Sequence, residues 1–287
     1  MDLRRLRELD DFRRGSAGRL TVFLHNDHRW TVPLIAAAQR EGLVPRPCDL
    51  HVFDRHHDAL APRCVTEIRR IRREDASVDA LVALCERSLS RNDDDWIKAA
   101  MEIGLVRHAV VFGVEGHLPD RQELEFTDHV GERHRIIPLG LPGSALEFQG
   151  SLSDCARRKE LAELWSILGW QPGEGGFSFS HGRPKAFLTV DLDCFVMVWR
   201  GYHIPWPEEV YAGEFMKTSN HAPTHAWTGK RFFQGLVDGA GVLDIAHEPE
   251  CCGGPEKSDR VLSDFNRYLL SGDINVSTEQ PGPWVPD

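Results

Sequence analysis

Residues 186–195 read Ala-Phe-Leu-Thr-Val-Asp-Leu-Asp-Cys-Phe, an apolar run that passes directly into two carboxylates. The run from Ala186 to Val190 is typical of a β-strand, because apolar and β-branched side chains suit a buried sheet. Residues two apart in an extended segment point the same way, so Asp191 and Asp193 can converge just beyond the strand. The stretch therefore predicts a buried strand with a polar site at its carboxyl end.

Similar apolar runs alternate with longer amphipathic segments along the chain. Further strands are expected at residues 20–24, 49–53, 108–112, 135–139 and 241–246. Helices are expected at residues 32–41, 78–85, 96–103, 154–168 and 259–270. This alternation predicts an α/β fold, a three-layer α/β/α domain with a mainly parallel sheet covered by helices on both faces.

The domain organisation is expected to be simple. The chain has no internal repeat and no low-complexity linker, so a single domain over residues 1–287 is predicted. Residues 1–18 and 275–287 are expected to be peripheral or loose. The polar segment 114–134 has room for a hairpin at the edge of the sheet.

The composition argues against several classes of protein. The formal net charge is −10, which disfavours nucleic-acid binding and is compatible with a cationic substrate. No apolar run reaches the length of about 18 residues that predicts a membrane span. The N-terminus alternates Arg with acidic residues, unlike a secretory signal. The seven cysteines lack metal-type spacing, which favours reduced thiols in a cytoplasmic protein.

Two further polar motifs follow predicted strands. His25-Asn-Asp-His28 follows the strand at 20–24, and Asp54-Arg-His-His-Asp58 follows the strand at 49–53. Ligands bind outside the carboxyl ends of the strands in open parallel sheets. These two motifs and Asp191-Leu-Asp193 are therefore expected to meet in one crevice.

The side chains of these motifs are of the types that bind metals. Four carboxylates packed together repel one another unless a cation neutralises them. Carboxylates with imidazoles suit Mn²⁺, and to a lesser degree Zn²⁺ or Fe²⁺. Two ions about 3.5 Å apart could share bridging carboxylates and activate water. The sequence thus predicts two divalent ions, favouring Mn²⁺, bound by His28, Asp54, His56, Asp58, Asp191 and Asp193.

Each motif alone has a plainer explanation. The Asp54–Asp58 segment could be a polar loop in which His56 partners an acid, and an Asp after a strand often caps the next helix. His28 alone means little in a chain with 14 histidines. The joint occurrence of the three motifs at strand ends favours the metal site.

At these motifs the sequence resembles the arginase and agmatinase ureohydrolases, with a lone His, an Asp-x-His-x-Asp loop and a late Asp-x-Asp. It departs from ordinary arginases in lacking the Asp-Pro downstream of Asp193 and the double glycine before His28. It is more similar to the atypical peptide arginases, which convert arginine in ribosomal peptides to ornithine. The similarity rests on residues 27–28, 53–58, 92–97, 190–195 and 248–254.

The resemblance implies further roles at the site. In ureohydrolases a Glu after the last parallel strand binds the guanidinium, and both Glu248 and Glu250 fit that position, with Glu250 favoured. It also implies His247 as a proton shuttle and Asp58 as the residue that accepts the proton of the attacking water. Asn92 is expected to bind substrate, although it would serve equally well as a helix cap, as would Asp95. Four histidines could lie near the mouth of the site or be structural, namely His25, His57, His221 and His225.

The expected function is metal-dependent hydrolysis of a guanidino group, in which peptidyl arginine becomes ornithine and urea is released. Free arginine, agmatine or another guanidino compound stays open as substrate, as does a homo-oligomeric state. The alternative enzyme is a deacetylase-like amidohydrolase with one zinc bound by Asp54, His56 and Asp191. A non-catalytic protein that binds metal and a peptide is the third possibility.

Overall fold

The computed structural model describes residues 13–74, 76–113, 124–139, 170–173, 176–179, 185–216 and 228–276. The helix expected at 154–168 and the tail after residue 276 lie outside these residues. None of the helices described is long and apolar enough to cross a membrane.

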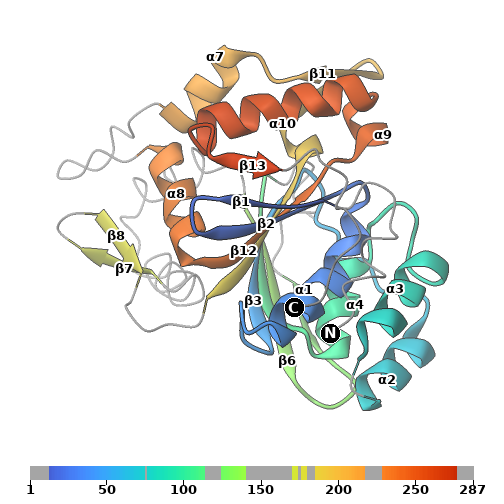
Figure 1. Ribbon diagram of the computed structural model, residues 1–287. Coiled ribbons are helices and arrows are strands. Elements are labelled where there is room, and N and C mark those ends of the chain that lie inside the picture. The colour runs from blue at the N-terminus through green and yellow to red at the C-terminus, as the bar shows by residue number, and fades with distance from the viewer. Residues whose placement is uncertain are drawn as a thin grey trace, which may run out of the picture.

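A nine-stranded sheet forms the centre of the fold (Figure 1). Its six inner strands run parallel, in the order β2 (Leu20–His25), β12 (Ala240–Ala246), β9 (Ala186–Asp191), β3 (Cys48–Phe53), β4 (Val106–Phe112) and β6 (Arg133–Leu139). Every residue of β9 and β12 is buried, as expected for central parallel strands. All six strands predicted from the sequence are present, which confirms an α/β fold with a mainly parallel sheet.

Antiparallel strands close both edges of the sheet. β1 (Arg13–Ala17) lies between β2 and β13 (Ile274–Val276). At the opposite edge, β5 (Leu124–Thr127) forms with β6 the predicted edge hairpin. β1 and β13 place parts of the segments expected to be peripheral or loose, residues 1–18 and 275–287, at the edge of the sheet. Main-chain pairing at an edge needs no apolar pattern, so the polar β1 and the three-residue β13 gave no strand signal.

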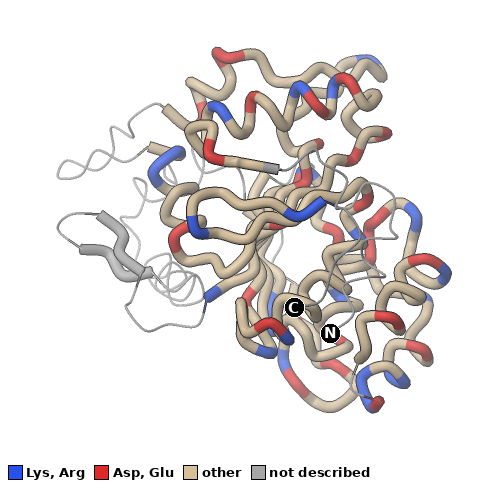
Figure 2. The backbone as a smooth tube through the Cα atoms, viewed as in Figure 1, with Lys and Arg blue, Asp and Glu red and all other residues tan. Residues whose placement is uncertain are grey.

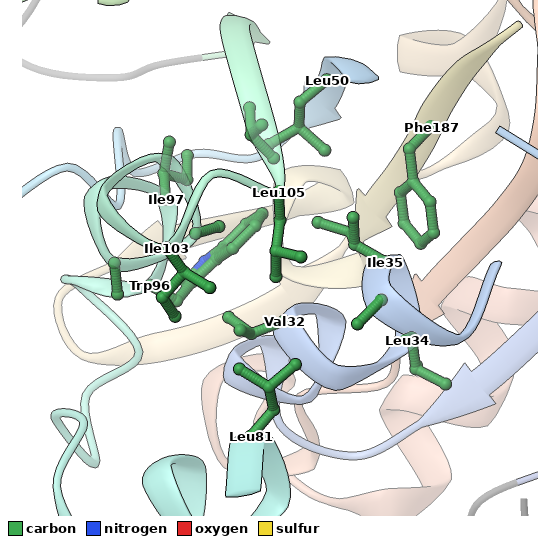
Figure 3. Close-up of a cluster of buried hydrophobic side chains, with 14 of the residues drawn as sticks. Val32, Leu34, Ile35, Leu50, Leu81, Trp96, Ile97, Ile103, Leu105 and Phe187 are labelled. Atoms are coloured by element: carbon green, nitrogen blue, oxygen red, sulfur yellow. The ribbon is translucent and has the colours of Figure 1, made fainter. Parts of the chain in front are cut away.

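Helices cover both faces of the sheet. One face packs against α1 (Thr31–Arg40), α2 (Val65–Arg73), α3 (Val78–Arg87) and α4 (Trp96–Ile103). The other face packs against α8 (Gly229–Gly239) and α10 (Pro255–Leu269). Figure 3 shows the first of these cores, in which Trp96 lies among Val32, Ile103 and Leu105.

Local sequence signals set the ends of the predicted helices. Ser77 caps α3 by accepting a hydrogen bond from the backbone N–H of Ala80. Gly104 ends α4 with a left-handed φ of 81°. α10 begins at Pro255, earlier than expected, because proline suits the first turn of a helix. α2 gave no sequence signal, because only Ile68 and Ile71 of its nine residues are buried.

Smaller elements complete the described chain. Two separate hairpins pair β7 (Trp170–Gly173) with β8 (Gly176–Phe179) and β10 (Val196–Trp199) with β11 (Tyr202–Pro205). Short helical turns lie at η4 (Leu192–Phe195), α7 (Glu208–Tyr211), η5 (Ala212–Met216) and α9 (Pro249–Cys252). Figure 2 shows residues of both charge signs interspersed along α2 and α10, as on an ordinary solvated surface.

Candidate metal centre

The three polar motifs lie at the carboxyl end of the sheet. In the parallel register, Val190 of β9 is level with Phe53 of β3 and with Ile245 of β12. The residues that follow these strands therefore emerge side by side. His28 joins them from a short turn after β2, η2 (His28–Trp30).

His28 is the centre of a first group of possible ligands. Its ring is completely buried, and Nδ1 lies 3.2 Å from Asp54 Oδ2. The same nitrogen lies 3.4 Å from Asp58 Oδ2 and 3.5 Å from Asp191 Oδ2. One imidazole nitrogen thus faces three carboxylate oxygens, a donor set that suits a divalent transition metal.

His56 is the centre of a second group on the open side of the first. Its Nδ1 lies 3.3 Å from Asp193 Oδ2 and 3.6 Å from Asp54 Oδ1. The His56 side chain is 54% exposed, whereas the side chains of Asp54 and Asp193 are buried. The structure therefore brings all six predicted ligands together in two groups, of which one is enclosed and one is accessible.

Asp54 belongs to both groups. Its Oδ2 faces His28 and its Oδ1 faces His56, so one carboxylate could bridge two ions. Oδ1 also accepts a hydrogen bond from the His56 backbone N–H at 2.6 Å, which fixes the orientation of the carboxylate. Bridging carboxylates are the feature that distinguishes a two-metal site from a single zinc site.

The donor atoms fit a metal because protein groups leave them unsatisfied. His28 Nδ1, Asp54 Oδ2 and both oxygens of Asp193 are buried and have no hydrogen-bond partner among the described residues. Buried polar atoms ordinarily find partners, and each one left without costs about 1–3 kcal/mol. Two divalent ions would satisfy these atoms and neutralise the carboxylates.

The electrostatics of the metal-free chain agree with this view. Burial, and then the charge of Asp54, raises the pKa of Asp58 well above its usual value and that of Asp193 to about 6. Burial lowers the pKa of His28, but the facing carboxylates of Asp191, Asp54 and Asp58 outweigh it and raise this pKa well above 6.5. Protons on Asp58 and His28 thus reduce the repulsion among the carboxylates, as bound cations would.

A buried hydrogen-bond network fixes the ring of His28. The Asp244 carboxylate can only accept, so the Thr189 hydroxyl donates to Asp244 Oδ2 at 3.0 Å. Thr189 Oγ1 then accepts from His28 Nε2, 3.1 Å away. With a metal bound, a proton kept on Nε2 would leave the lone pair of Nδ1 free for the ion that it shares with the three carboxylates. Partners of this kind orient metal ligands and tune their affinity.

Two further residues complete the network around Asp244. The Thr31 hydroxyl donates to Asp244 Oδ2 at 2.6 Å, and His25 Nε2 lies 2.8 Å from Oδ1. His25 Nδ1 lies 3.0 Å from the carbonyl of Asp27, so both neighbours of the ring are acceptors. His25 is buried and both of its ring nitrogens are engaged by these groups, which places it in the second layer of the site rather than at its mouth.

Trp96 supports the other side of His28. Its Nε1–H donates to Asp58 Oδ2 at 2.7 Å, and its ring centroid lies 4.7 Å from that of His28. Asp58 has a φ of 45°, a left-handed conformation that turns its carboxylate back toward the site. The hydrophobic core of α4 thus extends into the metal centre through one side chain.

The residues expected to bind substrate are placed differently from one another. Glu248 is buried, and its Oε1 accepts from the His28 backbone N–H at 2.7 Å, whereas the favoured Glu250 is exposed. Asn92 is also exposed, and its buried neighbour Asp93 lies against Glu248 instead. Burial, and then the charge of Glu248, raises the pKa of Asp93 to about 8. Burial, and then the charge of Asp191, raises the pKa of Glu248 to about 8.

The remaining candidates lie around the edges of the centre. His247 is buried with Nε2 3.5 Å from Asp259 Oδ1, so its role as a proton shuttle stays a prediction. His57 Nδ1 accepts from the backbone N–H of Ala59, and Asp95 Oδ1 accepts from that of Ser90, so both serve local loop structure. His221 and His225 lie outside the described residues.

Comparison with protein-family models finds none that matches, and comparison with curated proteins finds none similar to this chain. The geometry of the ligands therefore carries the functional argument.

Proposed function

We propose that this protein is a two-metal hydrolase that converts arginine within a peptide to ornithine and urea. The proposal includes an arginase/deacetylase-like three-layer fold and two divalent ions, favouring Mn²⁺. The observation that carries it is Asp54, whose two oxygens face two separate histidines. A single zinc ion needs only about four ligands, so the six gathered here favour two ions.

Each residue of the site has a separate role in the proposed reaction. His28, Asp54, Asp58 and Asp191 would hold the enclosed ion, and His56, Asp54 and Asp193 the accessible one. Bound divalent ions supply Lewis-acid activation of water at neutral pH. Glu248, beside His28, is the carboxylate proposed to pair with the substrate cation. Hydrolysis adds hydroxide to the guanidinium carbon and a proton to the departing amine, which yields urea and ornithine.

The experiment measures urea release from arginine-containing peptides by the Mn²⁺-loaded protein, with Asp193→Ala as the test variant. Loss of Asp193 should abolish urea formation and reduce the bound metal from two ions toward one. The control is Asp49→Ala, which removes a carboxylate at the opposite end of β3. Asp49 is 22% exposed and pairs with Arg107, so its loss should leave urea formation and the amount of bound metal unchanged.

Three outcomes would contradict the proposal. Urea formation that survives Asp193→Ala would remove the accessible metal position from the mechanism. Release of acetate from acetylated amines without urea would favour the one-zinc deacetylase. Tight metal binding with neither product would favour a protein that binds metal and peptide without turnover.

A further inference from the structure

Two buried carboxylates meet beside the metal centre, outside the six ligands. Asp93 is 7% exposed and Glu248 is 8% exposed, and the two carboxyl groups are close enough for each to act on the pKa of the other. Both residues have left-handed backbones, with φ of 54° and 41°. Non-glycine residues rarely adopt this conformation, and such outliers concentrate at functional sites.

Among the described residues, one cation, Arg29, lies beside this pair and forms an ion pair with Asp93. Its Nη1 lies 3.4 Å from Asp93 Oδ1. Arg29 also pairs with Asp27 through Nη2 at 2.5 Å, so one guanidinium is shared between Asp27 and Asp93. Asp93 Oδ1 accepts no hydrogen bond from the described residues, because the 3.4 Å ion pair lacks hydrogen-bond geometry.

We propose that Asp93 is the second carboxylate of a cation-binding pair with Glu248, and that the pair selects a guanidinium side chain. The substrate class rests on the proposed function. A planar guanidinium presents several N–H donors in fixed directions, so it can bridge two carboxylates that a single ammonium would contact at a point. Glu248 is tied to the backbone of His28, so a cation held by the pair lies beside the enclosed metal group.

The test compares the binding of three labelled peptides that differ at one position, carrying arginine, citrulline or lysine. Citrulline keeps the planar shape but removes the charge, and lysine keeps the charge but removes the planar donors. Binding is measured by fluorescence anisotropy with the Mn²⁺-loaded Asp193→Ala protein, in which turnover is not expected. The arginine peptide should bind about 30-fold or more tightly than the citrulline peptide, and also more tightly than the lysine peptide.

Asp93→Asn should remove most of this preference, and Glu248→Gln should do the same. Asn tolerates the left-handed backbone at residue 93, so the substitution keeps the loop conformation. Asp94→Asn makes the same charge change at the next residue, which is half-buried, and should keep the preference. Metal content should be the same in Asp93→Asn and Asp94→Asn.

Failure of this inference is distinguishable from failure of the proposed function. Equal arginine preference in Asp93→Asn and Asp94→Asn, or no preference for arginine over citrulline in the parent protein, would overturn the inference even if urea is released. A preference that depends on Asp93, in a protein that releases no urea, would support the cation site and contradict the proposed activity.

Discussion

Replacing Thr189 with Val tests whether the buried network sets the metal affinity of His28. Val has nearly the shape of Thr but no hydroxyl, so the change removes the acceptor 3.1 Å from His28 Nε2 and one donor to Asp244. A buried N–H left without an acceptor costs about 1–3 kcal/mol. A metal on Nδ1 requires the proton to stay on Nε2, and in Thr189→Val that N–H would have no acceptor. We therefore expect Mn²⁺ affinity to fall about 10–100-fold.

Thr31→Val is the matched control. Thr31 donates to the same oxygen of Asp244 but does not contact the His28 ring in the described network. Both variants should lose stability without metal, because each removes a buried hydrogen bond to Asp244. Only Thr189→Val should weaken the tighter Mn²⁺ site in a calorimetric titration. Unchanged affinity in Thr189→Val, or an equal loss in Thr31→Val, would refute the reasoning.

Three further predictions concern pH, support of the site and the core. Burial raises the pKa of Asp193 to about 6 and hydrogen bonding to a carboxylate raises that of His56 to about 9, so Mn²⁺ must displace protons. Its affinity should rise from pH 6 to 9, with proton release in calorimetry; a flat profile would contradict this. Trp96→Phe removes the hydrogen bond to Asp58 and should weaken Mn²⁺ binding about 10-fold in the same titration. Burial lowers the pKa of His51 to about 4, below its unfolded value of about 6.5, so the folded state should lose stability as pH falls between these values. When the free energy of unfolding is measured in urea across this pH range, His51→Leu should show a smaller loss of stability. An unchanged dependence of stability on pH would contradict the prediction.

The inner sheet and the convergence of the six candidate ligands could be predicted because both leave patterns in the sequence. Continuous apolar runs marked the buried parallel strands, and the spacing of two between carboxylates and histidines marked side chains that meet at the strand ends. β1 and β13 could not be predicted in this way. They contribute main-chain hydrogen bonds at an edge, which any residue except proline can provide.

The supporting residues show what single-motif reasoning leaves out. Asp244 does leave a signal, because a charged residue within the apolar run Gly-Val-Leu-Asp-Ile-Ala needs a buried partner. Asp93 leaves none, since three consecutive Asp residues before a helix look like ordinary first-turn acids. Only the packing of the 90–95 loop against Glu248 singles out one of the three.

The order of the strands has a consequence for how the chain assembles during synthesis. β2 and β3 follow each other in the sequence, yet β12 and β9 separate them in the sheet. The first half of the chain can therefore form two partial sheets, one ending in His28 and the other in Asp54, that have no common edge. β9 and β12 must insert between them before the enclosed ligand group exists. Contacts so distant in sequence form slowly, so metal loading belongs to the last stage of folding.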